Sequence, residues 1–257
     1  MGKKVFYYND ELNDDFSGVT RKTKVIDEKY KYIKRNPVWK LFEFVVYRIF
    51  VMPFAFIYIK CKFNHKVVGK EKLKRVKGGY FMYTNHTLMA GDAFIPNVVN
   101  FPKKTFTVVH PDNISIAASR PFIEMCGAIP LPATPRATIN FMDAIELRSK
   151  KCVVQIYPEA HVWPYYTGIR DFKSTSFRYP IKYNRPIFVM TNTFVKKKWG
   201  KVPKVISYID GPFECNKNLP PKEQEDELKE RIYSVMLDRA KLSSYKYYEY
   251  IKENTND

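Results

Sequence analysis

The chain has 257 residues with 44 Lys and Arg against 26 Asp and Glu, which gives a formal net charge of +18. Because 45% of the residues are hydrophobic and 16% are aromatic, the charge belongs to a folded protein and not to a disordered polycation. Such a charge requires an anionic partner, and the two ordinary ones are a nucleic acid and an anionic membrane surface.

The cysteines and the start of the chain indicate the compartment. The four cysteines form no CxxC pair and have no His at zinc-ligand spacing, so we expect neither a disulfide framework nor a metal site. Residues 1–15 become polar and acidic from Asn9 onward and lack the apolar core of a secretory signal. A reducing, cytoplasmic setting is therefore expected.

Two basic clusters flank the most apolar stretch of the sequence. Residues 21–40 carry a net charge of +6, residues 60–77 carry +7, and the stretch between them is Leu41 to Ile59. Its longest uncharged run has 11 residues, short of the roughly 18 to 20 that cross a bilayer as a helix. Pro53 is predicted to kink or divide any helix here.

The flanking charges favour an interfacial element, with aromatic side chains at headgroup depth and Lys and Arg on lipid phosphates. The alternative is that the apolar stretch forms a buried hairpin in the core and that the charged residues on either side of it simply face solvent. Nucleic acid is the weaker rival, because no nucleic-acid-binding motif accompanies the basic clusters. We therefore predict an N-terminal membrane-docking helical segment over residues 1–77.

From residue 78 onward, short apolar runs alternate with helical candidates. Helices are expected at Ala137 to Lys150 and at about Lys222 to Ala240. This alternation predicts an α/β domain over residues 78–257, with a mixed, mostly parallel sheet flanked by helices. The predicted strands are residues 79–84, 105–109, 127–131, 152–157, 187–192 and 205–209.

Several common reaction centres are excluded by inspection. The sequence has no GxGxxG, no GxxxxGK[ST] and no GxSxG motif, which argues against a dinucleotide site, a P-loop and a nucleophile elbow. It has only four histidines, and His86 follows directly on a predicted strand. Catalytic groups gather at such strand ends in open α/β sheets.

His86 and Asp92 have the chemistry of a general base and the carboxylate that orients it. Positions six apart are 240° apart on a helix, so His86 must lie in the loop before a helix. The equally weighted alternative is that His86 is an ordinary strand-end residue and that Asp92 only caps a helix starting at Ala93.

A second polar group follows the strand that ends at Tyr157. Glu159 comes first, then Arg170 and Lys173, a carboxylate and cations that suit a phosphate-bearing substrate. The alternative is that this segment is an ordinary loop after a strand and that its charged side chains face solvent. Two further pieces are the run from Cys126 to Leu131, with Arg136 shortly after, and Arg185-Pro186-Ile187.

Taken in order, these pieces resemble the glycerophospholipid acyltransferases, the family that includes 1-acylglycerol-3-phosphate acyltransferase. That family has an Asn-His-x4-Asp block, a Gly-x-Ile-Phe-Ile-Asp-Arg block, a Phe-Pro-Glu-Gly block with a downstream Phe-Lys-x-Gly, and a Pro-Ile block. The counterparts here are Asn85-His86 to Asp92, Gly127 to Leu131, Tyr157 to Ala160 with Phe172-Lys173, and Arg185 to Ile187.

The sequence departs from the family pattern at several positions. Five residues separate His86 from Asp92 where the family has four, and Ala160 replaces the glycine after the glutamate. Pro132-Ala133 stands where the second block has Asp-Arg, and His161-Val162-Trp163 replaces a Thr-Arg-Ser stretch. Two of the family's acceptor-binding cations are thus missing from their usual places.

The resemblance implies an acyl transfer from a thioester to the hydroxyl of a lysophospholipid, most closely 1-acylglycerol-3-phosphate, giving phosphatidic acid. His86 and Asp92 would be catalytic, and the substrate-binding residues would be Asn85, Glu159, Arg136, Arg170 and Lys173. No cofactor is implied beyond an acyl-carrier-protein or coenzyme A thioester as co-substrate. The expected location is the cytoplasmic face of a membrane, peripheral or monotopic, with no nucleic-acid partner.

Three alternatives stay open at this point. His161, two residues from Glu159, is a rival base, although the resemblance gives it no role. The altered spacing from His86 to Asp92 also suits a catalytically impaired or altered-acceptor lipid-binding relative. A basic nucleic-acid-binding module is less favoured.

Overall fold

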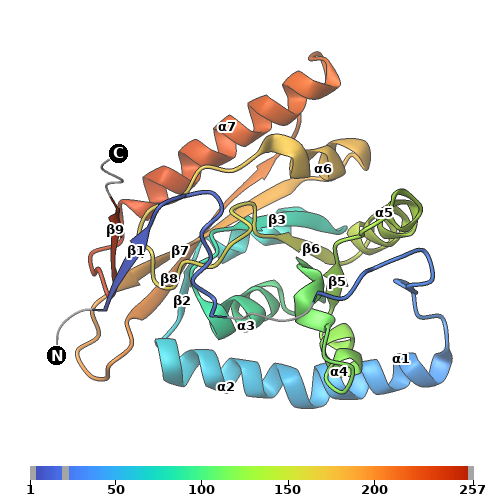
Figure 1. Cartoon of the computed structure of the whole chain (residues 1–257), viewed down its shortest axis with the longest axis horizontal. Helices are drawn as coiled ribbons and strands as arrows, with labels where there is room; N and C mark the ends of the chain where they lie inside the picture. Colours follow the sequence, from blue (N-terminus) through green and yellow to red (C-terminus); the bar gives the residue numbers. More distant parts are fainter. Residues whose placement is uncertain (1–3, 19–22, 254–257) are drawn as a thin grey trace.

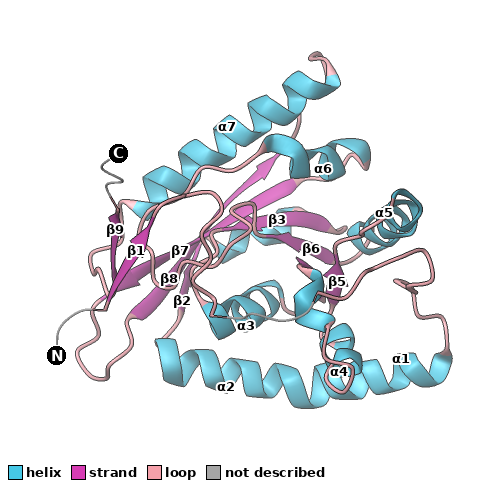
Figure 2. Ribbon diagram, in the orientation of Figure 1, coloured by secondary structure: helices cyan, strands magenta, loops and turns pink. Residues whose placement is uncertain are grey.

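A computed structural model describes residues 4–18 and 23–253 and shows one mixed sheet between two helical layers (Figures 1 and 2). All neighbouring strands of this sheet are parallel except β7 and β8, which form an antiparallel pair. The predicted α/β class with a mostly parallel sheet is confirmed. The strand order is β2 (Lys66–Val68), β8 (Lys204–Phe213), β7 (Ile187–Val195), β3 (Tyr80–Thr84), β6 (Val153–Ile156), β4 (Thr105–Val109) and β5 (Ala128–Pro130).

The alternation of side chains along β3 divides the core in two. Tyr80 and Met82 point to one face of the sheet, and Phe81 and Tyr83 point to the other. All four are buried, as expected for a central strand covered on both faces. The first layer is built on α3 (Met89–Asn100), and the second is built on α5 (Pro135–Ser149) and α7 (Pro221–Ala240).

The predicted elements of this domain are confirmed with small shifts at their ends. The predicted helix at residues 137–150 is α5, and the one at residues 222–240 is α7. In α7, Leu228, Ile232 and Met236 are fully buried, as their spacing of four residues on one face requires. The shorter elements are α4 (Arg120–Met125), α6 (Arg178–Lys182), η2 (Lys70–Arg75), η3 (Pro111–Ile114) and η4 (Ser174–Phe177).

The apolar N-terminal stretch forms one continuous helix of 27 residues, Pro37–Phe63. It consists of α1 (Pro37–Phe44), the π-helical segment η1 (Val45–Val51) and α2 (Met52–Phe63). The prediction that Pro53 kinks or divides the helix is wrong. The wider π-helical turns just before Pro53, in which the N–H of Met52 donates to the carbonyl of Tyr47, carry the chain past a residue that lacks an N–H.

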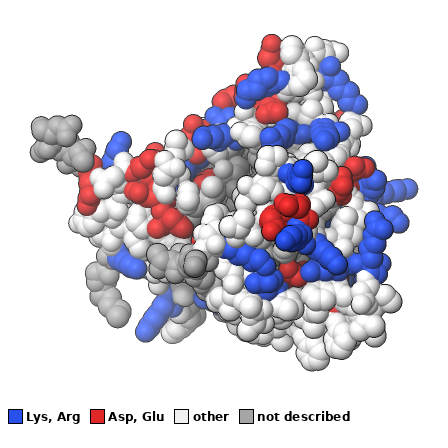
Figure 3. All heavy atoms as spheres, turned by 45° about the vertical axis from the view of Figure 1, so that its right-hand side comes forward, with Lys and Arg blue, Asp and Glu red and all other residues white. Residues whose placement is uncertain are grey.

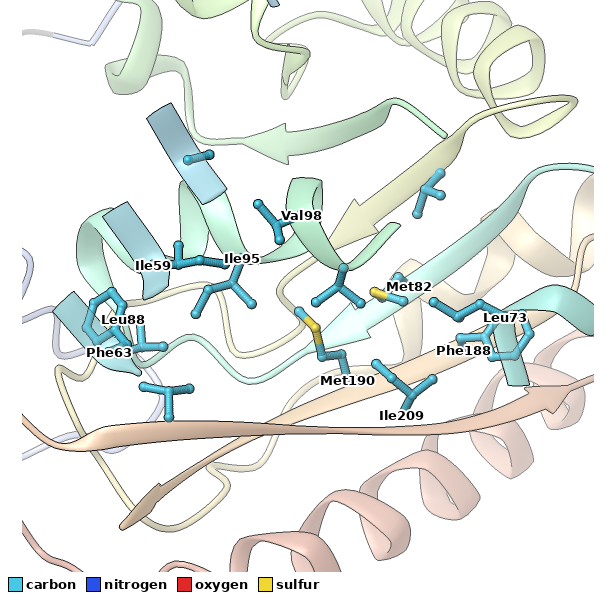
Figure 4. Close-up of a cluster of buried hydrophobic side chains, with 14 of the residues drawn as sticks. Ile59, Phe63, Leu73, Met82, Leu88, Ile95, Val98, Phe188, Met190 and Ile209 are labelled. Atoms are coloured by element: carbon cyan, nitrogen blue, oxygen red, sulfur yellow. The ribbon is translucent and has the colours of Figure 1, made fainter. Parts of the chain in front are cut away.

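This helix is longer than the uncharged run in the sequence suggested. Among the described residues it is the one helix long and apolar enough to cross a membrane by length and composition. One side of it packs on α3 and shares a core cluster with the sheet, and Figure 4 shows Ile59 beside Ile95 and Phe63 beside Leu88. The helix therefore joins the core along one face, whereas its other face stays exposed.

The two ends of the described chain meet in a small parallel pair, β1 (Val5–Tyr8) with β9 (Glu249–Lys252). This pair lies beside the main sheet (Figure 1). Aromatic side chains fill the contact, and the ring of Tyr250 stacks on that of Trp163 with centroids 4.9 Å apart. Trp163 is fully buried as a result.

Candidate active site

His86 lies in the loop between β3 and α3, at the carboxyl end of the central strand. The helix begins at Met89 and not at Ala93, which places Asp92 in its first turn, with its carboxylate turned back toward the loop. The geometric requirement that His86 precede the helix is confirmed. The alternative in which Asp92 only caps a later helix does not fit the structure.

The two side chains are directly hydrogen-bonded. His86 Nδ1 is 2.8 Å from Asp92 Oδ2, and the backbone N–H of Leu88 donates to the same oxygen at 2.8 Å. Asp92 is almost fully buried, whereas 19% of the His86 side chain is exposed. Because the carboxylate accepts the Nδ1 proton, Nε2 keeps its lone pair, and no described residue hydrogen-bonds to it. A fifth intervening residue is thus compatible with a base and its orienting carboxylate.

Tyr157 forms one wall of this site. Its ring stacks on the imidazole of His86 with centroids 4.3 Å apart, and its hydroxyl donates to the backbone carbonyl of Asp92 at 2.6 Å. Burial raises the pKa of Tyr157 well above its ordinary value, with a further contribution from the charge of Asp92. The phenol therefore stays neutral and holds both members of the pair in place.

Glu159 is turned into the protein. One carboxylate oxygen accepts the backbone N–H of His86 at 2.9 Å, and the other accepts the backbone N–H of Arg170 at 3.0 Å. Its side chain is fully enclosed, and burial raises its pKa. The prediction that Glu159 binds substrate does not fit this geometry, because the side chain is enclosed and both carboxylate oxygens accept hydrogen bonds within the protein. Glu159 instead fixes the backbone that carries His86.

Arg170 and Asn85 are also structural in this arrangement. The Arg170 guanidinium, with no exposed surface, lies 3.5 Å from Glu159 and donates to the carbonyls of His161 and Glu159. The amide of Asn85 exchanges two hydrogen bonds with the backbone of Asn192, at 3.0 and 2.8 Å. Neither side chain reaches solvent, so the prediction that they bind substrate is corrected by their burial.

The interactions of Asn192 extend to His65, a half-buried histidine directly before the edge strand β2. Ser207 donates to the side chain of Asn192 at 2.6 Å, and His65 Nε2 lies 2.7 Å from the Ser207 hydroxyl. Burial lowers the pKa of His65 to about 4, with smaller contributions from Lys70 and Lys60. His65 is therefore neutral in the folded protein at pH 7.

A pH-dependent stability follows from His65. His65 has a pKa of about 6.5 in the unfolded chain and about 4 in the folded chain, so between these pH values the unfolded chain binds more protons. The free energy of unfolding therefore falls as the pH drops from 6.5 toward 4. We expect a loss of about 2 to 3 kcal/mol between pH 7.5 and 4.5 from this group. Urea unfolding at both pH values measures it, and His65→Gln should lose correspondingly less. Equal losses in the parent and the variant would refute the assignment.

No protein-family model matches the sequence, and no curated protein matches it. The fold, in contrast, matches a solved structure, the 1-acyl-sn-glycerophosphate acyltransferase PlsC from Thermotoga maritima. The match has a TM-score of 0.55 and covers 82% of this chain and 84% of PlsC, at 17% sequence identity. The chain has the fold of PlsC. The resemblance inferred from the sequence blocks is thereby supported at the level of architecture.

Two predicted cations stay on the surface of the PlsC-like domain. Arg136 is exposed in the first turn of α5, directly after β5, and Lys173 is exposed just before η4. Neither forms an ion pair with a described carboxylate. His161, the rival base, has Nδ1 3.9 Å from Asp15, too far for a hydrogen bond, and it lacks the buried carboxylate that His86 has.

Ala160 occupies the position of a glycine in the family pattern, and the structure shows why glycine suits it. Its φ of 62° is in the left-handed region, which a side chain disfavours. We expect Ala160→Gly to raise the free energy of unfolding by about 1 kcal/mol in urea titrations. Ala93→Gly, at an exposed helical position one turn into α3, should lower it by a similar amount. A stability loss in Ala160→Gly would contradict this reading.

The sequence blocks did not reveal what holds the loop after Glu159. Backbone N–H groups of Trp163 and Tyr165 donate to the carbonyls of His86 and Thr87, at 3.1 and 2.8 Å. The indole N–H of Trp163 in turn donates to the carbonyl of Asp14, so both ends of the chain anchor the loop that supports His86. The high density of Tyr residues between positions 245 and 250 was the feature of the sequence that could have indicated an aromatic contact here.

Proposed function

We propose that the chain is a membrane-bound O-acyltransferase that moves a fatty acyl group from a thioester to the hydroxyl of a lysophospholipid. The observation that carries this proposal is the 2.8 Å contact between His86 Nδ1 and Asp92 Oδ2 at the carboxyl end of the central strand of a PlsC fold. The acceptor that fits the resemblance best is 1-acylglycerol-3-phosphate. With the sequence blocks and the PlsC fold, this function would place the chain in the glycerophospholipid acyltransferase family.

In this proposal, His86 Nε2 removes the proton from the acceptor hydroxyl while the oxygen attacks the thioester carbonyl. The buried charge of Asp92 stabilises the imidazolium that forms and keeps the ring oriented. Collapse of the tetrahedral intermediate breaks the carbon–sulfur bond, and the imidazolium returns its proton to the departing thiolate. The products are the ester and a free thiol, and the step needs no cofactor beyond the carrier-protein or coenzyme A thioester.

The acceptor phosphate needs cations that reach solvent. Arg170 is enclosed, so Arg136 and Lys173 are the predicted contacts that remain available. Arginine binds phosphate through paired N–H groups and lysine acts as a point charge. We propose these two residues for that role.

The exposed face of the helix Pro37–Phe63 is the proposed membrane contact. Figure 3 shows an uncharged lower margin, where the helix lies, with Lys and Arg gathered above it. Apolar side chains at headgroup depth with cations at the phosphates are typical of an interfacial helix, and we propose a monotopic attachment on the cytoplasmic leaflet. The exposed large apolar residues of this helix are Val38, Leu41, Phe42, Phe44, Ile49, Phe50, Phe54, Phe56 and Ile57.

An acyl-transfer assay on vesicles tests the proposal. Several lysophospholipids are offered with carrier-protein and coenzyme A thioesters, and the products are identified by mass. We expect transfer to an acceptor that carries a phosphate. Absence of transfer to every acceptor would leave the fold without this activity and refute the proposal.

A further inference from the structure

The connection between β7 and β8 combines an exposed indole with a concentration of lysines. Residues 196–203 read KKKWGKVP and contain no acidic residue. We call these residues the hairpin tip. Trp199 is 81% exposed, the largest exposed fraction among the described large hydrophobic side chains. An indole in this position loses the burial that normally stabilises tryptophan, so the exposure requires an explanation.

The hairpin tip lies at the end of the apolar helix. Lys197 Nζ donates to the backbone carbonyl of Lys62 at 2.5 Å, in the last turn of α2. Figure 1 shows the orange loop beside the cyan end of α2. Val202 packs against the core cluster, so the base of the hairpin tip is anchored while Trp199 projects.

The lysines of the hairpin tip carry charge that no described carboxylate neutralises, in contrast to three lysines of the C-terminal helix region. Lys222 and Lys229 on α7, and Lys241 directly after it, each pair with a carboxylate at 2.7 to 2.9 Å. Within the described part of the chain, no carboxylate pairs with the lysines of the hairpin tip. Exposed Lys62, whose carbonyl accepts from Lys197, brings a further lysine to this end of α2.

We propose that the hairpin tip is a second membrane contact, with Trp199 in the headgroup region of an anionic bilayer and the neighbouring lysines on its phosphates. Tryptophan prefers the membrane interface because its ring is apolar and its N–H is polar, and lysines near an anionic surface are each attracted to it. The proposal rests on the membrane attachment in the proposed function and continues that surface past the end of α2. The helix alone leaves the domain free to roll about the helix axis, and the hairpin tip opposes that motion.

Trp199 itself supplies the test. The chain has three tryptophans, of which Trp163 is fully buried and contributes a constant signal. In a Trp39→Phe background, vesicles of phosphatidylcholine with phosphatidylglycerol should shift the Trp199 emission to the blue, and brominated lipid should quench it. Protein that sediments with the vesicles while its Trp199 emission stays unchanged would overturn the proposal.

The charge contribution has a matched control. Lys198→Gln/Lys201→Gln should weaken binding to anionic vesicles about tenfold, since each lysine near such a surface contributes about fivefold before salt screening. Lys182→Gln/Lys217→Gln removes two exposed lysines that lie near α6 and the start of α7, away from the hairpin tip, and should weaken binding less than twofold. Equal losses in the two pairs would overturn the proposal.

An acidic protein is the other partner class that such a patch attracts. Apo acyl-carrier protein is therefore added in place of vesicles. A blue shift of Trp199 with the carrier protein and none with vesicles would overturn the membrane assignment. None of these measurements uses acyl transfer, so an inactive chain that binds vesicles through Trp199 would refute the proposed function alone.

Discussion

His86→Ala should lower the rate of acyl transfer by about 10² to 10⁴ with the protein still folded and bound to vesicles, because the variant lacks the base that accepts the hydroxyl proton. The measurement is the initial rate of product formation at saturating thioester. The variant should still fold because the His86 side chain is partly exposed. The buried carboxylate of Asp92 also keeps a hydrogen bond from the N–H of Leu88.

Two histidine variants control for this result. His110 is exposed on the loop after β4 and pairs only with Asp112, so His110→Ala should leave the rate within twofold. His161→Ala tests the rival base. If His161→Ala abolished transfer and His86→Ala did not, the assignment of the base would be reversed.

Arg170→Ala should lower the free energy of unfolding by about 3 to 5 kcal/mol, because it leaves Glu159 in a fully buried position without its cation. Urea denaturation at pH 7 measures this. Arg178→Ala, at an exposed position with one long hydrogen bond, should cost less than 1 kcal/mol.

The same variant separates the two roles considered for Arg170. A structural partner of Glu159 gives a large loss of stability. A phosphate contact would raise KM for the acceptor at nearly unchanged stability. The second pattern would contradict the structural account of this residue.

The sequence was sufficient for the features that depend on local pattern. The strand runs were rich in β-branched and aromatic residues, and their buried neighbours in the sheet required such residues on both faces. The placement of His86 before its helix followed from the 100° periodicity alone. These are properties of short segments, and the structure agrees with them.

Features that depend on tertiary contacts were not predictable. Nothing local distinguishes a carboxylate that faces substrate from one that faces backbone N–H groups, and Glu159 turned inward because Arg170 and the loop of His86 meet there. The continuity of the helix through Pro53 required the preceding π-helical turns. The pairing of β1 with β9 joins opposite ends of the chain.

Counting charge by long segments also concealed the hairpin tip. Its lysines were diluted among the 180 residues from Gly78 onward. A window of ten residues would have shown the cluster around Trp199. Its position beside α2 is known only from the fold.

The most direct test of the central claim is product formation from 1-acylglycerol-3-phosphate on anionic vesicles, followed by mass together with the release of free thiol. The proposal predicts phosphatidic acid and thiol in equal amounts from the parent protein, and both at a rate about 10² to 10⁴ lower from His86→Ala at equal vesicle binding. Transfer by His86→Ala at the rate of the parent would contradict the claim that His86 is the base.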